Sequence, residues 1–233
     1  MSRIAVPKLG KTALLVCDIQ EVFRPIIHGM SSLIKTSEFL VSTATQLDLP
    51  IVVTEQYPKA MKSTVTELSS IWIKADAARA EQAATSGVTF LPTPVFEKTQ
   101  FSMCTEPFMS HLQVLGVDSA IICGIESHIC VMQTALDLME RGMQVYIPVD
   151  SVSSTRSFDR TVALRRLEAS GAVMTTSESV VFQLLRDSKH PKFRTVSGMI
   201  KEQAFLALSS TTTRKFSFLS IVYLLIGVGR FFF

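Results

Sequence analysis

The chain has 233 residues, of which 47% are hydrophobic and 18% are charged, and its formal net charge is +3. This composition excludes an intrinsically disordered chain, and the length suits one α/β domain rather than two. The basic residues are scattered and do not form a stripe with interleaved aromatic residues, so we expect no nucleic acid partner.

The cysteines lie at positions 17, 104, 123 and 130. They form no Cys-x-x-Cys pair and no cluster with histidine at zinc spacing, so the sequence predicts neither a metal site nor a disulfide framework. Free thiols suit a reducing compartment, which indicates a cytoplasmic location. The first residues lack the apolar core of a secretory signal, which agrees with that expectation.

Apolar runs alternate with helix-periodic segments along the first half of the chain. Residues 12–18 (TALLVCD) predict a strand buried on both faces, with Asp18 at its end. Residues 31–47 have apolar positions at helical spacing, and residues 49–55 predict a second strand, which completes a β-α-β unit. Residues 62–89 fit this alternation poorly, and their Ala-rich part predicts an exposed helix in an insertion near the site.

The alternation continues through the second half of the chain. Strands are predicted at 94–98, 119–124, 144–150 and 172–176, and helices at 107–115, 131–141, 159–169 and 177–187. This pattern predicts a three-layer α/β/α fold whose mostly parallel sheet has about six strands. Residues 10–205 are predicted to form this domain, followed by a C-terminal extension at 206–233.

Three predicted strands are followed by side chains that can carry covalent chemistry. Asp18 and Lys98 each end a strand, and Cys130 lies shortly after the strand at 119–124, where a helix begins. Because the carboxyl ends of parallel strands meet at one edge of a sheet, we expect the three side chains to converge. A helix N-terminus and a nearby ammonium both lower the pKa of a thiol, so Cys130 is expected to be activated. Asp18 would then move the proton while Lys98 balances the charge.

Each of these residues also has an ordinary structural interpretation. A cysteine at a helix start is more often an inert buried thiol, an aspartate at a strand end often caps a turn, and a lysine is usually solvated. Only their occurrence at successive strand ends favours catalysis. The turn before Cys130 could supply oxyanion donors from the backbone of Glu126 and Cys130.

Further side chains close to the strand ends are candidates for substrate contact, namely Gln20, Phe23, Tyr57, Phe101 and His128. The aromatic residues could form an apolar wall for a small planar amide or ester, or simply pack under loops. Gln20 could orient Asp18 or the substrate, or cap the following turn. His128 could contact substrate or face solvent.

Three segments carry a resemblance to a known family. GIESHICVMQTALDL at 124–138 resembles the nucleophile signature of the isochorismatase-like cysteine hydrolases, which include nicotinamidases and carbamoyl hydrolases. LLVCDIQ at 14–20 and FEKTQFSMC at 96–104 resemble the strands that carry the family's catalytic aspartate and lysine, which map to Asp18 and Lys98.

The resemblance implies hydrolysis of a small amide or ester through a covalent intermediate on Cys130. It also implies a cis peptide bond between Ile125 and Glu126, the absence of a cofactor, and self-association into homo-oligomers. The alternative is a catalytically silent protein of the same fold that acts as a binding or scaffold protein.

The details favour one subgroup of the family. Residues 52–59 (VVTEQYPK), 175–187 and 190–193 resemble the eukaryotic isochorismatase domain-containing proteins. Nicotinamidases bind zinc through Asp and His residues after the second strand, whereas residues 54–61 here contain neither, so the sequence predicts no zinc and argues against nicotinamidase activity. Isochorismatases generally lack the nucleophilic cysteine that this chain has at Cys130, so isochorismate is not the expected substrate.

The chain ends in a nearly continuous apolar run from Phe216 to Phe233, interrupted by Arg230. Because a bilayer-spanning helix needs about 20 apolar residues, this run is marginal as an anchor. The alternatives are a C-terminal anchor in an intracellular membrane and an irregular extension that packs on the domain or on a partner.

Overall fold

The structure is a computed structural model that describes residues 6–87 and 90–209. The chain divides into two compact units, Met1–Ser197 and Gly198–Phe233. The first contains the sheet and the helices around it. The described part of the second continues helix α8 (Phe193–Ser209).

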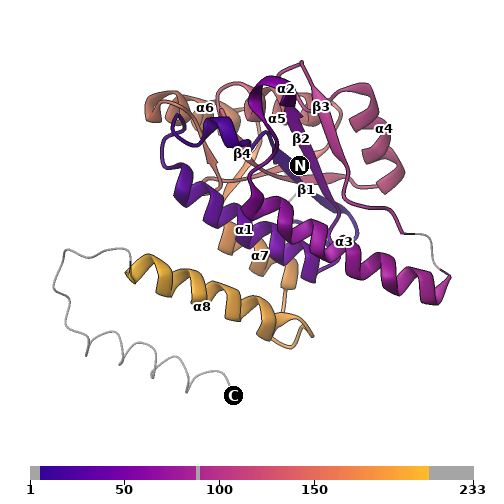
Figure 1. Cartoon of the computed structure of the whole chain (residues 1–233). Helices are drawn as coiled ribbons and strands as arrows, with labels where there is room; N and C mark the ends of the chain where they lie inside the picture. The colour runs from indigo at the N-terminus through magenta and orange to yellow at the C-terminus, as the bar shows by residue number, and fades with distance from the viewer. Residues whose placement is uncertain (1–5, 88–89, 210–233) are drawn as a thin grey trace, which may run out of the picture. The chain divides into compact units, whose positions relative to one another are not determined.

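A seven-stranded parallel sheet forms the centre of the first unit (Figure 1). Its strands are β1 (Thr12–Cys17), β2 (Ile51–Gln56), β3 (Val95–Lys98), β4 (Ser119–Ile125), β5 (Gln144–Pro148), β6 (Val152–Ser153) and β7 (Val173–Thr175). Their order is β3-β2-β1-β4-β5-β7, with β6 paired to β4 beyond the end of β5, and every ladder is parallel. The predicted parallel sheet is therefore confirmed, with one short strand more than expected.

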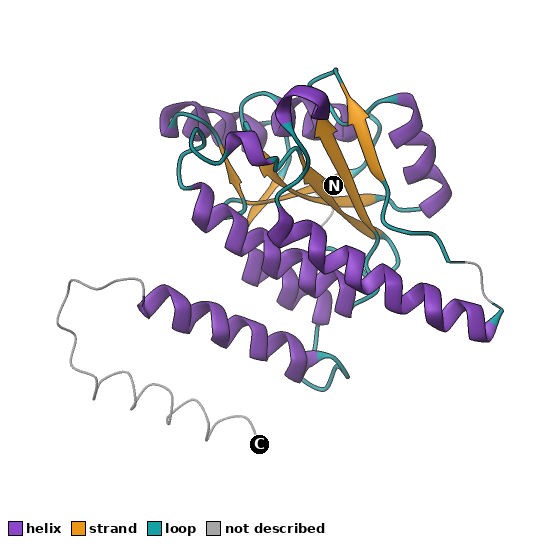
Figure 2. Ribbon diagram, in the orientation of Figure 1, coloured by secondary structure: helices purple, strands orange, loops and turns teal. Residues whose placement is uncertain are grey.

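Helices cover both faces of the sheet, as Figure 2 shows. They are α1 (Met30–Gln46), α2 (Pro58–Met61), α3 (Thr66–Ser86), α4 (Glu106–Leu115), α5 (Cys130–Glu140), α6 (Ser157–Ala169) and α7 (Ser177–Leu185), with a short 3-10 helix η1 at Glu21–Phe23. Helices α1, α3 and α7 lie together on one face, and α4, α5 and α6 on the other. This arrangement confirms the three-layer α/β/α fold.

The two central strands, β1 and β4, are buried along their whole length. Strands that are covered on both faces consist of continuous apolar runs, which is why TALLVC and SAIICGI lack polar alternation. Gly124 is paired with Cys17 at the carboxyl end of these strands. A Cβ at Gly124 would lie 2.6 Å from both the Cβ and the carbonyl oxygen of Cys17, so only glycine fits beside the residue that precedes Asp18.

The segment at 62–89 is more integrated than the sequence indicates. Helix α3 packs against α1 and buries Leu68 and Trp72, whereas most of its Ala-rich second half is exposed. The N–H of Val65 donates to the carbonyl oxygen of Ile19, so α3 begins beside the end of β1. The predicted exposed helix is therefore confirmed for the Ala-rich part, whereas the first turns of α3 complete the layer over α1.

No helix in the described ranges combines the length and apolar character needed to cross a membrane. The run from Phe216 to Phe233 lies outside the described residues, so both alternatives for it remain predictions.

Candidate functional site

Asp18 follows β1 in an unusual backbone conformation, with φ at +56°. Aspartate tolerates this left-handed region better than most residues, although the conformation still costs about 1–2 kcal/mol. The N–H of Asp18 donates to the carbonyl oxygen of Thr54 at 3.2 Å, and Thr54 Oγ1 donates to Asp18 Oδ1 at 2.8 Å. The end of β2 therefore holds the carboxylate at the edge of the sheet.

Lys98 ends β3 and forms an ion pair with Asp18, with Nζ 2.6 Å from Oδ2 and side-chain exposures of only 0% and 2%. Its Nζ also lies within hydrogen-bond distance of Gln56 Oε1 at 2.6 Å and of the carbonyl oxygens of Gln100 and Phe101 at 3.1 and 3.0 Å. An ammonium has three protons, so these four acceptors use its donor capacity completely.

The acidic groups around Lys98 keep it protonated although it is buried. Burial alone would lower the pKa of Lys98, but the adjacent acidic groups of Cys17, Asp18 and Cys130 outweigh burial and raise it. Lys98 is therefore a permanent positive charge whose protons are already bound, which suits electrostatic support better than proton donation to a substrate.

Cys130 is the first residue of α5 and is buried beside the same carboxylate. Burial raises the pKa of the Cys130 thiol to about 12, and the charge of Asp18 and a hydrogen bond to it act in the same direction, while Lys98 offsets part of the effect. The expected lowering of the Cys130 pKa is therefore wrong, because desolvation and the carboxylate outweigh the ammonium. In the resting protein the group is a thiol with a proton acceptor next to it.

The turn between β4 and α5 reverses the chain without a cis peptide bond. Every peptide bond among the described residues is trans, and Glu126 has a φ of +52°. The expected cis bond between Ile125 and Glu126 is therefore contradicted, because the left-handed conformation of Glu126 supplies the change of direction that the cis bond was expected to give.

Some backbone N–H groups of this turn have acceptors, whereas that of Cys130 has none within its helix. The N–H of Ser127 donates to Ser153 O at 2.9 Å and that of Ile129 to Glu126 O at 2.8 Å, so both are occupied. Cys130 begins α5, and the first N–H groups of an α-helix have no acceptor within the helix. The N–H of Cys130 therefore has no acceptor within α5.

His128 and Glu126 form a polar network at the outer side of the turn. His128 Nδ1 lies 3.2 Å from Glu126 Oε2 and 3.1 Å from Ser154 Oγ, and Nε2 lies 3.9 Å from Asp159 Oδ2. The hydroxyl of Thr155 also donates to Glu126. Both side chains are partly buried, so they stiffen the turn from outside and neither faces solvent freely.

Gln20 has a completely buried amide that binds backbone groups. Its Nε2 donates to the carbonyl oxygens of Gln56 and Lys62 at 3.0 and 2.6 Å, and its Oε1 accepts the N–H of Gln56 at 2.8 Å. The Gln20 amide therefore binds neither Asp18 nor the turn that follows it, but backbone groups distant in sequence. Gln20 affects Lys98 only indirectly: it fixes the backbone of Gln56, whose side chain accepts from Lys98.

The three aromatic candidates differ in exposure and in their contacts with the site. Phe23 is half-buried in η1, whereas the side chains of Tyr57 and Phe101 are 49% and 54% exposed. The Tyr57 N–H donates to the carbonyl oxygen of Lys98, and the Phe101 carbonyl accepts from Lys98 Nζ. The backbones of Tyr57 and Phe101 thus hold Lys98, while their side chains are exposed.

Thr54 and Gln56 are site residues that the sequence interpretation missed. They are two positions apart on β2, so their side chains lie on the same face of the strand, one on Asp18 and the other on Lys98. Glu55, between them, turns the other way and accepts the N–H of Thr64 at 2.6 Å. The polar residues at the end of an otherwise apolar strand were the signal that could have identified them.

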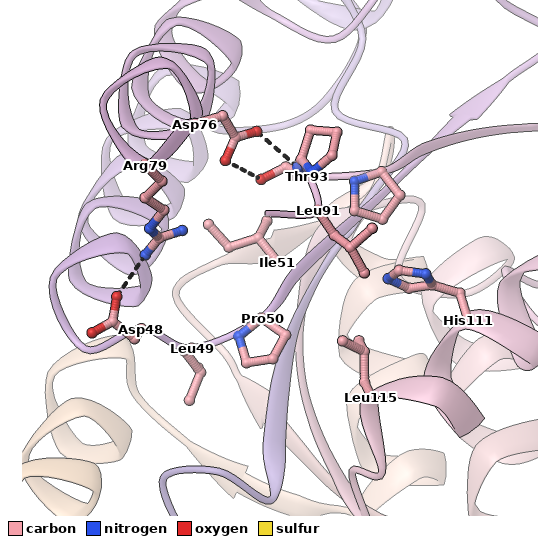
Figure 3. A pocket seen from close by; sticks show the side chains of 12 residues that line it. Asp48, Leu49, Pro50, Ile51, Asp76, Arg79, Leu91, Thr93, His111 and Leu115 are labelled. Carbon is pink, nitrogen blue, oxygen red and sulfur yellow. Dashed lines mark hydrogen bonds and ion pairs between the residues drawn. The ribbon is translucent and has the colours of Figure 1, made fainter. Parts of the chain in front are cut away.

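A pocket of about 190 Å³ lies at the opposite, amino end of β2 (Figure 3). Apolar residues such as Leu49, Ile51 and Leu91 line it together with His111, whose pKa is lowered by burial. Its carboxylates are occupied: Asp76 accepts from Thr93, and Asp48 pairs with Arg79 at 3.0 Å. The length of the strand separates this pocket from Asp18, Lys98 and Cys130.

Across residues 6–87 and 90–209, no group of three or more His, Cys, Asp or Glu side chains is arranged to hold a metal ion. The four cysteines are free thiols.

The sequence matches proteins from several eukaryotes. The secreted isochorismatase effector Isc1 of Phytophthora sojae (strain P6497) is 38% identical over 205 residues, which cover 85% of this chain and 90% of that protein. Isochorismatase domain-containing protein 2 of Xenopus laevis is 37% identical over 202 residues, covering 85% and 89%.

Solved structures agree with the fold. A Caenorhabditis elegans protein described as MAR1 ribonuclease is 40% identical, with a TM-score of 0.73 over 84% of this chain and 93% of that one. YcaC from Pseudomonas aeruginosa has the same TM-score of 0.73 at 19% identity, which shows similarity of fold alone, and covers 91% of this chain and 100% of that one. A model of the isochorismatase domain matches residues 12–179. The chain therefore belongs to the isochorismatase domain family.

Proposed function

We propose that this protein hydrolyses a small amide or ester through a covalent intermediate on Cys130. The supporting observation is that a buried thiol at a helix N-terminus lies beside a carboxylate that is itself ion-paired with Lys98. A nucleophile, a proton acceptor and a fixed positive charge are the parts that such a reaction needs. Membership of a family of hydrolases supports the same reaction class.

The first half of the proposed reaction forms a thioester. The Cys130 sulfur attacks the carbonyl carbon as its proton passes to Asp18, and the carbonyl oxygen becomes an oxyanion. The N–H groups of Cys130 and Glu126 are the proposed donors to this oxygen. When the intermediate collapses, the C–N or C–O bond breaks and Asp18 returns the proton to the leaving amine or alcohol.

The second half restores the enzyme. Asp18 accepts a proton from a water molecule that attacks the thioester carbon, and the proton then returns to the sulfur as the carboxylic acid product leaves. Lys98 stays protonated throughout, because its protons are bound by Asp18, Gln56 and two backbone carbonyls. Its role is to hold Asp18 in place and to balance the negative charge as it moves between carboxylate and sulfur.

A mass-spectrometric screen tests this proposal. The protein is incubated with a panel of small amides and esters, and intact mass and peptide mapping are used to find an acyl group on Cys130. We expect an adduct with at least one ester, together with its acid product, and neither in Cys130→Ala. The matched control is Cys104→Ala, which removes a half-buried thiol on the same side of the sheet and should behave as wild type. Product release that persists in Cys130→Ala would contradict the proposal and favour another nucleophile.

RNA should be included in the screen because one similar structure is described as a ribonuclease. We expect no cleavage of RNA by this chain. The turn beside Cys130 carries the carboxylate of Glu126, and Asp159 of α6 lies against His128 of the same turn. Lys98 has no free proton for a phosphate. Cleavage of RNA that is lost in Cys130→Ala would replace the proposed substrate class while keeping the nucleophile.

We also propose that the protein self-associates and acts in the cytoplasm. A YcaC structure from Escherichia coli is described as an octameric hydrolase, and the free thiols of this chain suit a reducing compartment. Light scattering coupled to size-exclusion chromatography should give a mass that is a multiple of 25.7 kDa. A monomer over the whole concentration range would contradict self-association, and fluorescence microscopy of the tagged full chain tests the location.

A further inference from the structure

Thr54 holds Asp18 through both its main chain and its side chain. Its carbonyl oxygen accepts the Asp18 N–H at 3.2 Å, and its Oγ1 donates to Asp18 Oδ1 at 2.8 Å. In the register of β1 and β2, Thr54 is paired with Cys17, so it stands beside the last residue before Asp18. Both hydrogen bonds act on a residue in the left-handed region, which persists only where its surroundings enforce it.

The two oxygens of the Asp18 carboxylate have different partners. Oδ2 accepts from Lys98 Nζ at 2.6 Å and from Cys17 Sγ at 3.6 Å, whereas Oδ1 accepts from Thr54 at 2.8 Å. A thiol is a weak donor, and the Lys98 ammonium is shared with three other acceptors. The hydroxyl of Thr54 is therefore the donor that fixes the second oxygen, and with it the plane of the carboxylate.

A β-branched residue suits position 54 in the strand, but this preference does not explain why the residue carries a hydroxyl. Threonine and valine have similar shape and both favour strands, and β2 already contains Val52 and Val53. Thr54 is completely buried, where a hydroxyl is unfavourable unless it has a hydrogen-bond partner. The partner is Asp18, so the hydroxyl is explained by the carboxylate that it holds.

We infer that Thr54 is a positioning residue, which orients the Asp18 carboxylate to receive the Cys130 proton. This inference rests on the proposed function, since it assigns Thr54 a role only if Asp18 is the proton acceptor. Thr54 acts through the Asp18 carboxylate, to which its hydroxyl donates.

Alkylation of Cys130 by iodoacetamide provides a test that needs no known substrate. The sulfur bonds to the CH2 carbon, iodide leaves, and the thiol proton passes either to Asp18 or to hydroxide in solution. Transfer to Asp18 gives a rate that is independent of pH across the neutral range, whereas the hydroxide route gives a limb that rises toward the thiol pKa of about 12. Peptide mapping follows Cys130 separately from the other thiols.

Thr54→Val should lower the neutral-range rate about tenfold, because a hydrogen bond to a charged group is lost, and should leave the alkaline limb unchanged. Thr54→Ser, which keeps the hydroxyl, should restore most of the rate. Thr43→Val is the matched control, since Thr43 is also buried but its hydroxyl has no partner among the described residues. In the Asp18→Asn background, Thr54→Val should have no further effect.

The possible failures are distinguishable. An unchanged neutral-range rate in Thr54→Val, or an equal loss in Thr43→Val, overturns the role of Thr54 and leaves the proposed function standing. A wild-type neutral-range rate that does not depend on Asp18 overturns the proposed function instead. Circular dichroism checks folding of each variant, and Thr54→Ala serves as the second hydroxyl-free variant if the valine variant does not fold.

Discussion

The Nζ of Lys98 lies 2.6 Å from Oδ2 of Asp18, and both side chains are removed from solvent. A buried ion pair of this kind is costly to form, and it is even more costly to break by removing one partner. The pair joins β1 to β3 across β2, so the stability of the sheet edge and the electrostatics at Cys130 depend on the same two residues.

Removal of the Lys98 charge should destabilise the protein strongly. Lys98→Met leaves the Asp18 carboxylate buried without its ion-pair partner, and we expect a loss of about 3–5 kcal/mol in the free energy of unfolding. Urea denaturation measures this loss. The double variant Lys98→Met with Asp18→Asn should recover part of it, and a double variant that is as unstable as the sum of the single variants would show that the two charges do not interact.

Gln20 should matter for stability through the backbone that it binds. Gln20→Ala leaves two carbonyl oxygens and one N–H without their buried partner, which should cost about 1–3 kcal/mol or more. Gln113→Ala in α4 is the control, because Gln113 is exposed. Equal unfolding midpoints for the two variants would show that water replaces the Gln20 amide without loss.

Gly124→Ala should be among the most damaging single-methyl changes. The added Cβ would lie 2.6 Å from the Cβ and the carbonyl oxygen of Cys17, so β1 or β4 must shift. We expect a loss of about 3 kcal/mol or more, at the upper end for overpacking. Gly198→Ala has open space around the new methyl and should be neutral or stabilising. Thermal melting of both variants checks the contrast, and a normal melting temperature for Gly124→Ala would show that the strands separate easily.

The free energy of unfolding should decrease above pH 9, because buried thiols resist ionisation. Burial raises the pKa of both Cys123 and Cys130 from 9.0 to about 12. A thiol with a raised pKa contributes stability that is fully present below pH 9 and is lost as the pH rises towards 12, because the unfolded chain releases its protons first. Urea denaturation at pH 8, 9 and 10 should show a progressive decrease that is smaller in Cys123→Ala. A pH-independent value over this range would contradict the burial of these groups.

Much of the fold follows from local patterns in the sequence. The apolar run at β1 and the helical spacing in α1 predict these elements to within two residues, because each buries a continuous surface and has little alternative structure. The sequence predicts the packing of helix α3 less clearly. Only Leu68 and Trp72 of its residues are buried, so the contact with α1 leaves almost no periodic signal.

The sequence predicts that Asp18, Lys98 and Cys130 meet at one edge of the sheet, but it predicts neither the contacts of Thr54 and Gln56 nor the electrostatics at Cys130. Strand order brings Asp18 and Lys98 to one edge, and β1, β2 and β3 are neighbours in sequence and in space. The pKa of Cys130 depends on how deeply the thiol is buried and on the balance between the charges of Asp18 and Lys98, and neither follows from residue spacing. The contacts of Gln20 do not follow from residue spacing either, because its partners, Gln56 and Lys62, are distant in sequence.

The most direct test of the account compares the rate of Cys130 alkylation at neutral pH in wild type and Asp18→Asn. Removal of the carboxylate should lower the pKa of Cys130 from about 12, because the charge of Asp18 and its hydrogen bond both raise it. Asp118→Asn, an exposed carboxylate, controls for the loss of a charge. If Asp18 accepts the proton during attack, Asp18→Asn reacts more slowly at pH 7 despite its lower thiol pKa. A faster reaction in Asp18→Asn would show that the carboxylate only suppresses the thiol, and would contradict its role as the base.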